Sequence, residues 1–193
     1  AALGRPGVVV ERRALWPTGL AELGVSGRIP AAERAEPGRA LGRLSDIGWG
    51  TRLRELLREP DQQVPDDVLR AVVQVLATWG WEQRPSAVVA VPSTSRPQLV
   101  GSLASRLAEV GRLQLLGSLE PVRPTSGPRS NSAQRLRQVS GAFAVPESWS
   151  LAGAPVLLVD DRTDSGWTLT EAARVLRRAG AGAVLPLVLA VDG

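Results

Sequence analysis

The chain has 193 residues and contains no cysteine, no histidine, no methionine and, on inspection, no lysine. Without cysteine it forms no disulfides and no thiolate metal sites. Without histidine it has no His-dependent nucleophilic triad and no His-ligated zinc or iron. The lack of lysine also excludes Schiff-base chemistry and the lysine of an ATP-binding phosphate loop.

Long hydrophobic runs are missing as well. No apolar stretch approaches the roughly 20 residues that a membrane helix needs. The N-terminal sequence AALGRPGVVVERR lacks the long apolar region of a secretory signal. These absences predict a cytoplasmic protein without a membrane partner. The chain also lacks an initial Met, which suggests a fragment or a processed chain.

Positive charge is carried by arginine alone, at a net charge of +4 and a pI near 11.2. Because guanidinium stays protonated, this pI overstates how basic the surface is. The excess permits nucleic-acid or phosphate partners, although a solvated surface is the commoner role of such arginines. The 44% hydrophobic and 22% charged residues are ordinary for a globular protein.

The chain divides by pattern at about residue 50. Residues 1–50 place Pro and Gly at close intervals, which favours loops, although residues 8–11 are compatible with a short strand. We interpret 1–50 as a linker or irregular extension that either packs on the core or belongs against a neighbour. Residues 51–193 are expected to form the main domain.

In the main domain, helical and strand-like segments alternate. The helical pattern covers residues 51–59, 65–81, 97–111, 133–139 and 168–180. Short apolar runs typical of buried strands cover residues 86–92, 113–119, 141–145, 155–160 and 182–191, and a polar loop covers 120–132. This alternation predicts an α/β fold, a mainly parallel twisted sheet with helices on both faces.

The segment VLLVDDRTDSGWT (156–168) carries the strongest functional signal. Parallel sheets bind ligands at the carboxyl ends of their strands, and Asp160 and Asp161 fall at such an end. The hydroxyls and backbone N–H groups that follow, together with a helix N-terminus, suit a phosphate. The loop is expected to comprise Thr163, Asp164, Ser165, Gly166, Trp167 and Thr168.

This segment resembles the signature of type I phosphoribosyltransferases: four apolar residues, two acidic residues and a short loop ending Thr/Ser-Gly-x-Thr. The resemblance implies that fold. It also implies that Asp160 and Asp161 hold ribose hydroxyls and act in catalysis, and that the loop Thr163–Thr168 holds the 5-phosphate. It further implies magnesium bound with phosphoribosyl pyrophosphate, with no direct protein ligand to the metal. Arg162 and Trp167 depart from the family pattern. A ring at Trp167 would narrow the site or offer a base-stacking surface.

Two further segments fit the same resemblance. Ser93, Thr94, Ser95 and Arg96 follow a buried strand, where the family contacts pyrophosphate. They are equally compatible with a capped turn in which Ser95 is the N-cap. The segment SNSAQRLRQVSGAF (130–143) resembles the mobile loop of ComF-like phosphoribosyltransferases, with Gln134, Arg135 and Arg137 placed to fold over a phosphate. A surface hairpin with solvated arginines is the alternative.

Several long blocks, among them GRALGRLSDIGWGTRLRELL and VAVPSTSRPQLVGSLA, resemble the C-terminal region of actinobacterial RecQ-family ATP-dependent DNA helicases. The resemblance implies a regulatory domain whose partners are DNA, the helicase core and a phosphoribosyl or nucleotide ligand. The chain itself contains no helicase motor, because a GxxxxGK[ST] loop is absent. The alternatives are an active phosphoribosyltransferase and an inert scaffold.

Overall fold

The computed structural model describes residues 3–125, 127 and 131–193, and it is built on a six-stranded sheet. The strand order is β1-β2-β8-β7-β3-β4, in which all neighbours are parallel except the β1/β2 pair at one edge. The strands are β1 (Val8–Val10), β2 (Gly38–Arg43), β3 (Ala87–Ala90), β4 (Gln114–Ser118), β7 (Pro155–Thr163) and β8 (Ala183–Val191). The mainly parallel sheet predicted from the sequence is confirmed.

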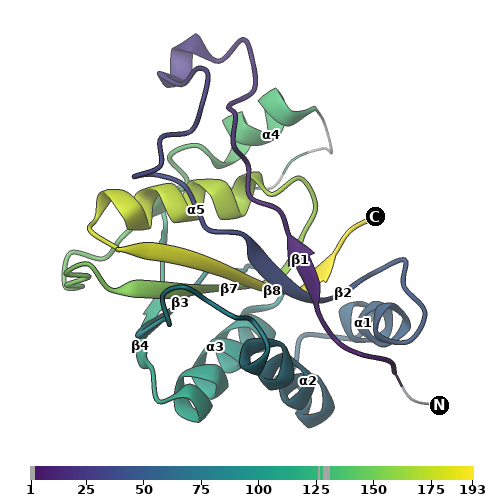
Figure 1. The fold of residues 1–193 in the computed structure, drawn as a ribbon. Helices are drawn as coiled ribbons and strands as arrows, with labels where there is room; N and C mark the ends of the chain where they lie inside the picture. Colours follow the sequence, from purple (N-terminus) through teal and green to yellow (C-terminus); the bar gives the residue numbers. More distant parts are fainter. Residues whose placement is uncertain (1–2, 126, 128–130) are drawn as a thin grey trace.

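Helices cover both faces of this sheet (Figure 1). One face packs against α1 (Trp49–Arg58), α2 (Asp66–Ala77) and α3 (Pro97–Gly111), and the other against α5 (Trp167–Arg178). Alternate residues of β7 serve the two layers, because successive side chains of a strand point to opposite faces. The predicted positions of these strands and of the helix over 97–111 are confirmed, but β4, predicted to be buried, is a largely exposed edge strand. No described helix is long and apolar enough to cross a membrane.

A third layer lies on the outer side of α5. The segment that contains Trp16, Leu20 and Ile29 packs with α4 (Ser132–Val139) into a separate apolar cluster that also includes Trp167. In Figure 1 this purple N-terminal segment and α4 lie together above α5. A two-stranded ribbon of β5 (Glu120–Pro121) and β6 (Phe143–Ala144) flanks α4 in the chain. Residues 126 and 128–130 of the predicted polar loop lie outside the described residues.

Residues 1–50 are more regular than the sequence predicts. The interpretation of this stretch as irregular is wrong for β2, which pairs in parallel with β8 inside the main sheet. Its glycines favoured a turn, but they serve close packing: a Cβ at Gly38 would lie 2.5 Å from the Pro186 carbonyl oxygen. The domain division at residue 50 stays a prediction.

Strand β7 is longer than predicted. It continues through Asp160 and Asp161 to Thr163, because β8 pairs with this polar part as well, in the register Arg162↔Ala190 and Thr163↔Val191. The loop before α5 is therefore only Asp164–Gly166. Helix α2 has Pro65 as its N-cap residue, without a side-chain cap bond, and Asp67 in its first turn binds Arg52 through two hydrogen bonds.

Candidate ligand-binding site

The carboxyl ends of β7 and β8 open into a pocket of about 150 Å³. Its floor is the short loop from β7 to α5, and Arg135 of α4 forms part of its wall. The pocket is lined by Arg135, Arg162, Thr163, Asp164, Ser165, Gly166, Thr168 and Asp192. The structure thus brings together most of the predicted phosphate loop and one of the two predicted loop arginines, from segments that are far apart in the chain.

Backbone N–H groups at the start of α5 are available to this pocket. Gly166 adopts a left-handed conformation with φ 82°, and the first helical hydrogen bond runs from the Thr170 N–H to the Gly166 oxygen. The N–H groups of the first turn before Thr170 therefore lack intrahelical partners. In the loop before α5, the Ser165 carbonyl oxygen accepts a hydrogen bond from the Arg13 Nε at 2.8 Å. This geometry favours an anion, because N–H dipoles and the helix end both carry partial positive charge.

The charges on the pocket wall are partly neutralised by the protein itself. Arg162 binds Asp192 through two hydrogen bonds of 2.9 and 2.6 Å, which fixes the end of β7 to the residue after β8. This bidentate pairing raises the pKa of the Arg162 guanidinium. The departure of Arg162 from the family pattern therefore has a structural partner. Arg135 contacts the Gln138 side chain at 3.5 Å and lies across the pocket from the loop.

The two predicted ribose-binding aspartates directly precede the pocket residues Arg162 and Thr163 on β7, but they do not line the pocket and are buried, at 7% and 9% exposure. The Asp160 carboxylate accepts the Asp161 N–H at 2.8 Å, and the Asp161 carboxylate accepts the Arg162 N–H at 2.7 Å. Burial, and next to it the negative charge of Asp161, raise the pKa of Asp160 well above the usual range. This direction favours the protonated form of the Asp160 carboxyl.

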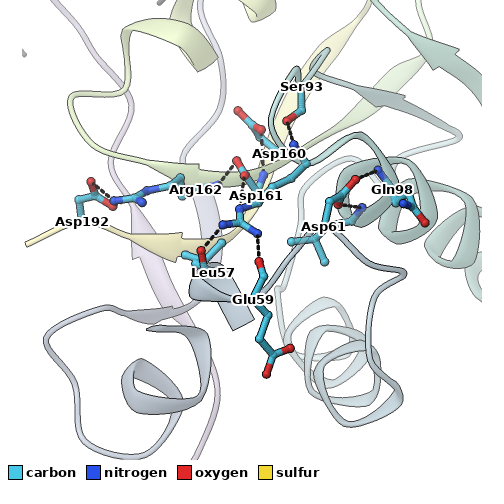
Figure 2. Close-up of polar contacts among 11 residues, drawn as sticks. Leu57, Glu59, Asp61, Ser93, Gln98, Asp160, Asp161, Arg162 and Asp192 are labelled. Carbon is cyan, nitrogen blue, oxygen red and sulfur yellow. Dashed lines mark hydrogen bonds and ion pairs between the residues drawn. The ribbon is translucent and has the colours of Figure 1, made fainter. Parts of the chain in front are cut away.

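Arg96 approaches the acid pair from the loop between β3 and α3. Its guanidinium lies 4.0 Å from the Asp161 Oδ2 and donates to the carbonyl oxygens of Leu57, at the end of α1, and Glu59. The Glu59 contact measures 3.2 Å. Figure 2 shows Leu57 and Glu59 next to Asp161, with dashed lines at the two carbonyl oxygens. The predicted pyrophosphate-binding arginine is therefore engaged by the protein's own oxygens.

The rest of the predicted pyrophosphate loop behaves as a capped turn. The Ser93 Oγ accepts the Arg96 N–H at 3.0 Å, and Thr94 and Ser95 are exposed. Ser95 is not the N-cap of α3, because Arg96 holds that position. The carboxylate of Asp61 instead accepts the N–H groups of Gln98 and Leu99, at 2.8 and 3.0 Å. A distant carboxylate thus occupies the anion-attracting end of α3.

Trp167 neither narrows the pocket nor offers a base-stacking surface, so both sequence interpretations of its ring are wrong. The residue is 2% exposed and lies stacked against Trp16, with ring centroids 6.3 Å apart. The Arg13 guanidinium covers the same ring at 4.7 Å. Only the backbone of Trp167 is left for a ligand, because its side chain is committed to the outer apolar cluster.

Helix α4 divides the predicted loop residues between two roles. Arg137 points to the N-terminal segment, where it binds the Glu22 carboxylate at 2.7 Å and the Gly19 carbonyl oxygen at 3.2 Å. Gln134 is exposed and its backbone N–H is capped by Asn131. Arg135 alone of the three lines the pocket. Sequence reasoning missed Arg13, Asp61 and Asp192, since nothing in their local sequence indicates partners so far along the chain.

Comparison with known proteins gives neighbours in fold only. No protein-family model matches the chain, and no curated protein matches it. A purine phosphoribosyltransferase from Pyrococcus horikoshii Ot3 is similar over 65% of this chain and 71% of its own, at 20% identity and a TM-score of 0.42. An adenine phosphoribosyltransferase from Thermoanaerobacter pseudethanolicus is similar over 64% and 81%, at 12% identity and a TM-score of 0.40. These values define no family, so the function is argued from the site.

Proposed function

We propose that this chain is a phosphoribosyltransferase-like domain that binds a phosphoribosyl or nucleotide phosphate in a regulatory role. The pocket at the end of β7 carries this proposal. It combines the free N–H groups of the first turn of α5, the hydroxyls of Ser165 and Thr168, and the guanidinium of Arg135 around one cavity. A sugar attached to a phosphate in this cavity would meet the acid pair of Asp160 and Asp161, and carboxylates accept hydrogen bonds from hydroxyls.

Calorimetric titration with ribose 5-phosphate tests this binding directly. Arg135→Gln removes a charge from the pocket wall, and we expect affinity to fall roughly tenfold, since charged hydrogen bonds contribute about 1.5–3 kcal/mol. Arg137→Gln is the matched control on the same helix, because Arg137 binds Glu22 and not the pocket. Its affinity should equal that of the wild type. No binding by the wild type, or equal losses in both variants, would contradict the proposal.

We further propose that the domain belongs to a RecQ-family DNA helicase, on the sequence blocks that resemble that family. DNA and the helicase core are then the proposed partners, and the cytoplasm the proposed location. The arginines around the pocket, with the exposed residues of α4, would contact nucleic-acid phosphates. A gel-shift series at rising salt tests this role, since affinity carried by phosphate contacts falls steeply with salt. Absent or salt-insensitive binding would count against it.

An active phosphoribosyltransferase is the second candidate, and the acid pair at the end of β7 favours it. In that case Asp160 and Asp161 would stabilise the cation-like ribosyl centre of the reaction. The residues present do not fit a magnesium ion bound directly by Asp161. Arg96 fills the place beside Asp161, and no group of three or more acidic residues in the described part of the chain forms a metal site. Release of pyrophosphate from phosphoribosyl pyrophosphate with a free base would establish this candidate.

A further inference from the structure

We infer that Arg96 supplies the positive charge beside the acid pair, so that this site binds a sugar monophosphate without a divalent cation and discriminates against a diphosphate. The inference rests on the proposed binding of a phosphoribosyl ligand. It names Arg96 and Asp61 as the residues that set which ligand the site accepts.

The geometry around Arg96 is that of an occupied cation position. Three oxygens face its guanidinium: the Asp161 Oδ2 at 4.0 Å, the Glu59 carbonyl oxygen at 3.2 Å and the Leu57 carbonyl oxygen. Carboxylate and carbonyl oxygens are the ligands that hard divalent cations take in proteins. Here the Arg96 side chain of the same chain is their partner.

A magnesium ion brought to Asp161 would have to displace or approach this guanidinium. The displaced side chain would leave two backbone carbonyls without a donor, and like charges repel at short range. Arg96 also has little freedom to leave, because its N–H is held by the Ser93 Oγ and its side chain is only 18% exposed. Arg96 therefore balances the negative charge beside the acid pair, so that the pair can accept hydrogen bonds from sugar hydroxyls without a metal ion.

Asp61 adds the second half of the inference. Its carboxylate occupies the first N–H groups of α3, beside the loop that carries Arg96. A second phosphate group extending from the sugar towards this helix would find the N–H donors taken and a negative charge in their place. At α5, by contrast, no side-chain cap bond occupies the start of the helix, although Asp164 and Asp192 line the same pocket.

The test compares four titrations of the wild-type chain, with ribose 5-phosphate and with phosphoribosyl pyrophosphate, each in EDTA and in excess MgCl2. Ribose 5-phosphate should bind with the same affinity in both buffers, within about twofold, a difference of under 0.5 kcal/mol. Phosphoribosyl pyrophosphate should bind more weakly in both. Binding of ribose 5-phosphate only in magnesium, or tighter binding of the diphosphate, would overturn the inference.

Two variants separate the roles of the residues. In Arg96→Gln, affinity for ribose 5-phosphate in EDTA should fall roughly tenfold, and magnesium should restore part of it. Asp61→Asn keeps an oxygen for the α3 N–H groups but removes the negative charge. It should therefore reduce the difference in affinity between ribose 5-phosphate and phosphoribosyl pyrophosphate. Arg52→Gln, which breaks the ion pair with Asp67 between α1 and α2, is the matched control and should change neither affinity.

A measurement without any sugar ligand distinguishes failure of this inference from failure of the proposed function. Electron paramagnetic resonance of added Mn²⁺ should show no stoichiometric binding to the wild type, and binding to Arg96→Gln, whose vacated oxygens then face a cation. A purely structural Arg96 would not produce this gain, and binding of Mn²⁺ to the wild type would refute the assignment. If no sugar phosphate binds in any buffer, the proposed function fails, whereas the Mn²⁺ result still decides the role of Arg96. If Arg96→Gln does not fold, binding of Mn²⁺ to the wild type would still refute the assignment.

Discussion

Replacing Trp167 tests how the N-terminal segment is attached to the site. The residue begins α5, is 2% exposed and stacks on Trp16, so truncation leaves a cavity inside the outer apolar cluster. Replacing a buried Trp by Ala costs about 3–5 kcal/mol, and the lost aromatic pair is included in that cost. A domain of this size is stable by only about 5–15 kcal/mol, so Trp167→Ala should lower the free energy of unfolding by a large fraction.

Trp167→Phe is the matched control for this substitution. The indole Nε1 has no hydrogen-bond partner in the described part of the chain, so Phe gives up no hydrogen bond and keeps an aromatic ring against Trp16. We expect it to cost about 1–1.5 kcal/mol, less than Trp167→Ala, because Phe removes a smaller buried volume. Urea unfolding followed by far-UV circular dichroism measures both, because tryptophan fluorescence changes with the substitution itself. A cost below about 1 kcal/mol for Trp167→Ala, or equal costs for both variants, would refute this reasoning.

Three further substitutions have signs that follow directly from the structure. Burial and the Asp161 charge raise the pKa of Asp160 above its ordinary 3.8, so the stability from this group is complete below that value and is lost as pH rises through the raised pKa. Asp160→Asn should flatten this loss in urea unfolding at a series of pH values, and an unchanged pH profile would contradict it. Gly166→Ala should cost about 1–2 kcal/mol, because φ is 82° there while the nearest atoms to a Cβ are 4.0 Å away. Gly101→Ala, in open space within α3, should instead stabilise by about 0.4–1 kcal/mol in thermal unfolding.

Local patterns were sufficient to predict most of the sheet and its helices. The apolar runs of β3 and β8 and the periodic apolar pattern of α3 can be recognised from consecutive residues of the element itself. The phosphate loop was predictable for the same reason, since a strand, a glycine and a helix start follow one another within a few residues. Each of these features is decided over a short stretch of chain.

Strand β2 was not predicted because the local sequence does not show the reason for its glycines. Gly38 and Gly42 favour a turn, but a Cβ at Gly38 would collide with Pro186 of β8, and one at Gly42 would crowd Trp49 at 3.2 Å. The glycines permit neighbouring backbones to approach closely. Gly38 and Pro186, which meet in this way, are about 150 positions apart in the chain. The polar end of β7 was missed for a related reason, because its strand conformation comes from pairing with β8 rather than from its own residues.

The polar groups of the two halves of the candidate site differ in whether the protein's own residues already bind them, and this difference is the reason for preferring the proposed binding role. At α5 the donors of the first helical turn remain available and a cavity of about 150 Å³ faces them. At α3 the donors are bound by Asp61, and Arg96 is bound by two carbonyl oxygens and Asp161. A transferase has to bind a diphosphate leaving group as firmly as the 5-phosphate, because stabilising the departing charge is part of the catalysis. A domain that keeps one anion site open and occupies the other with its own side chains is suited to hold a phosphoribosyl group without transferring it.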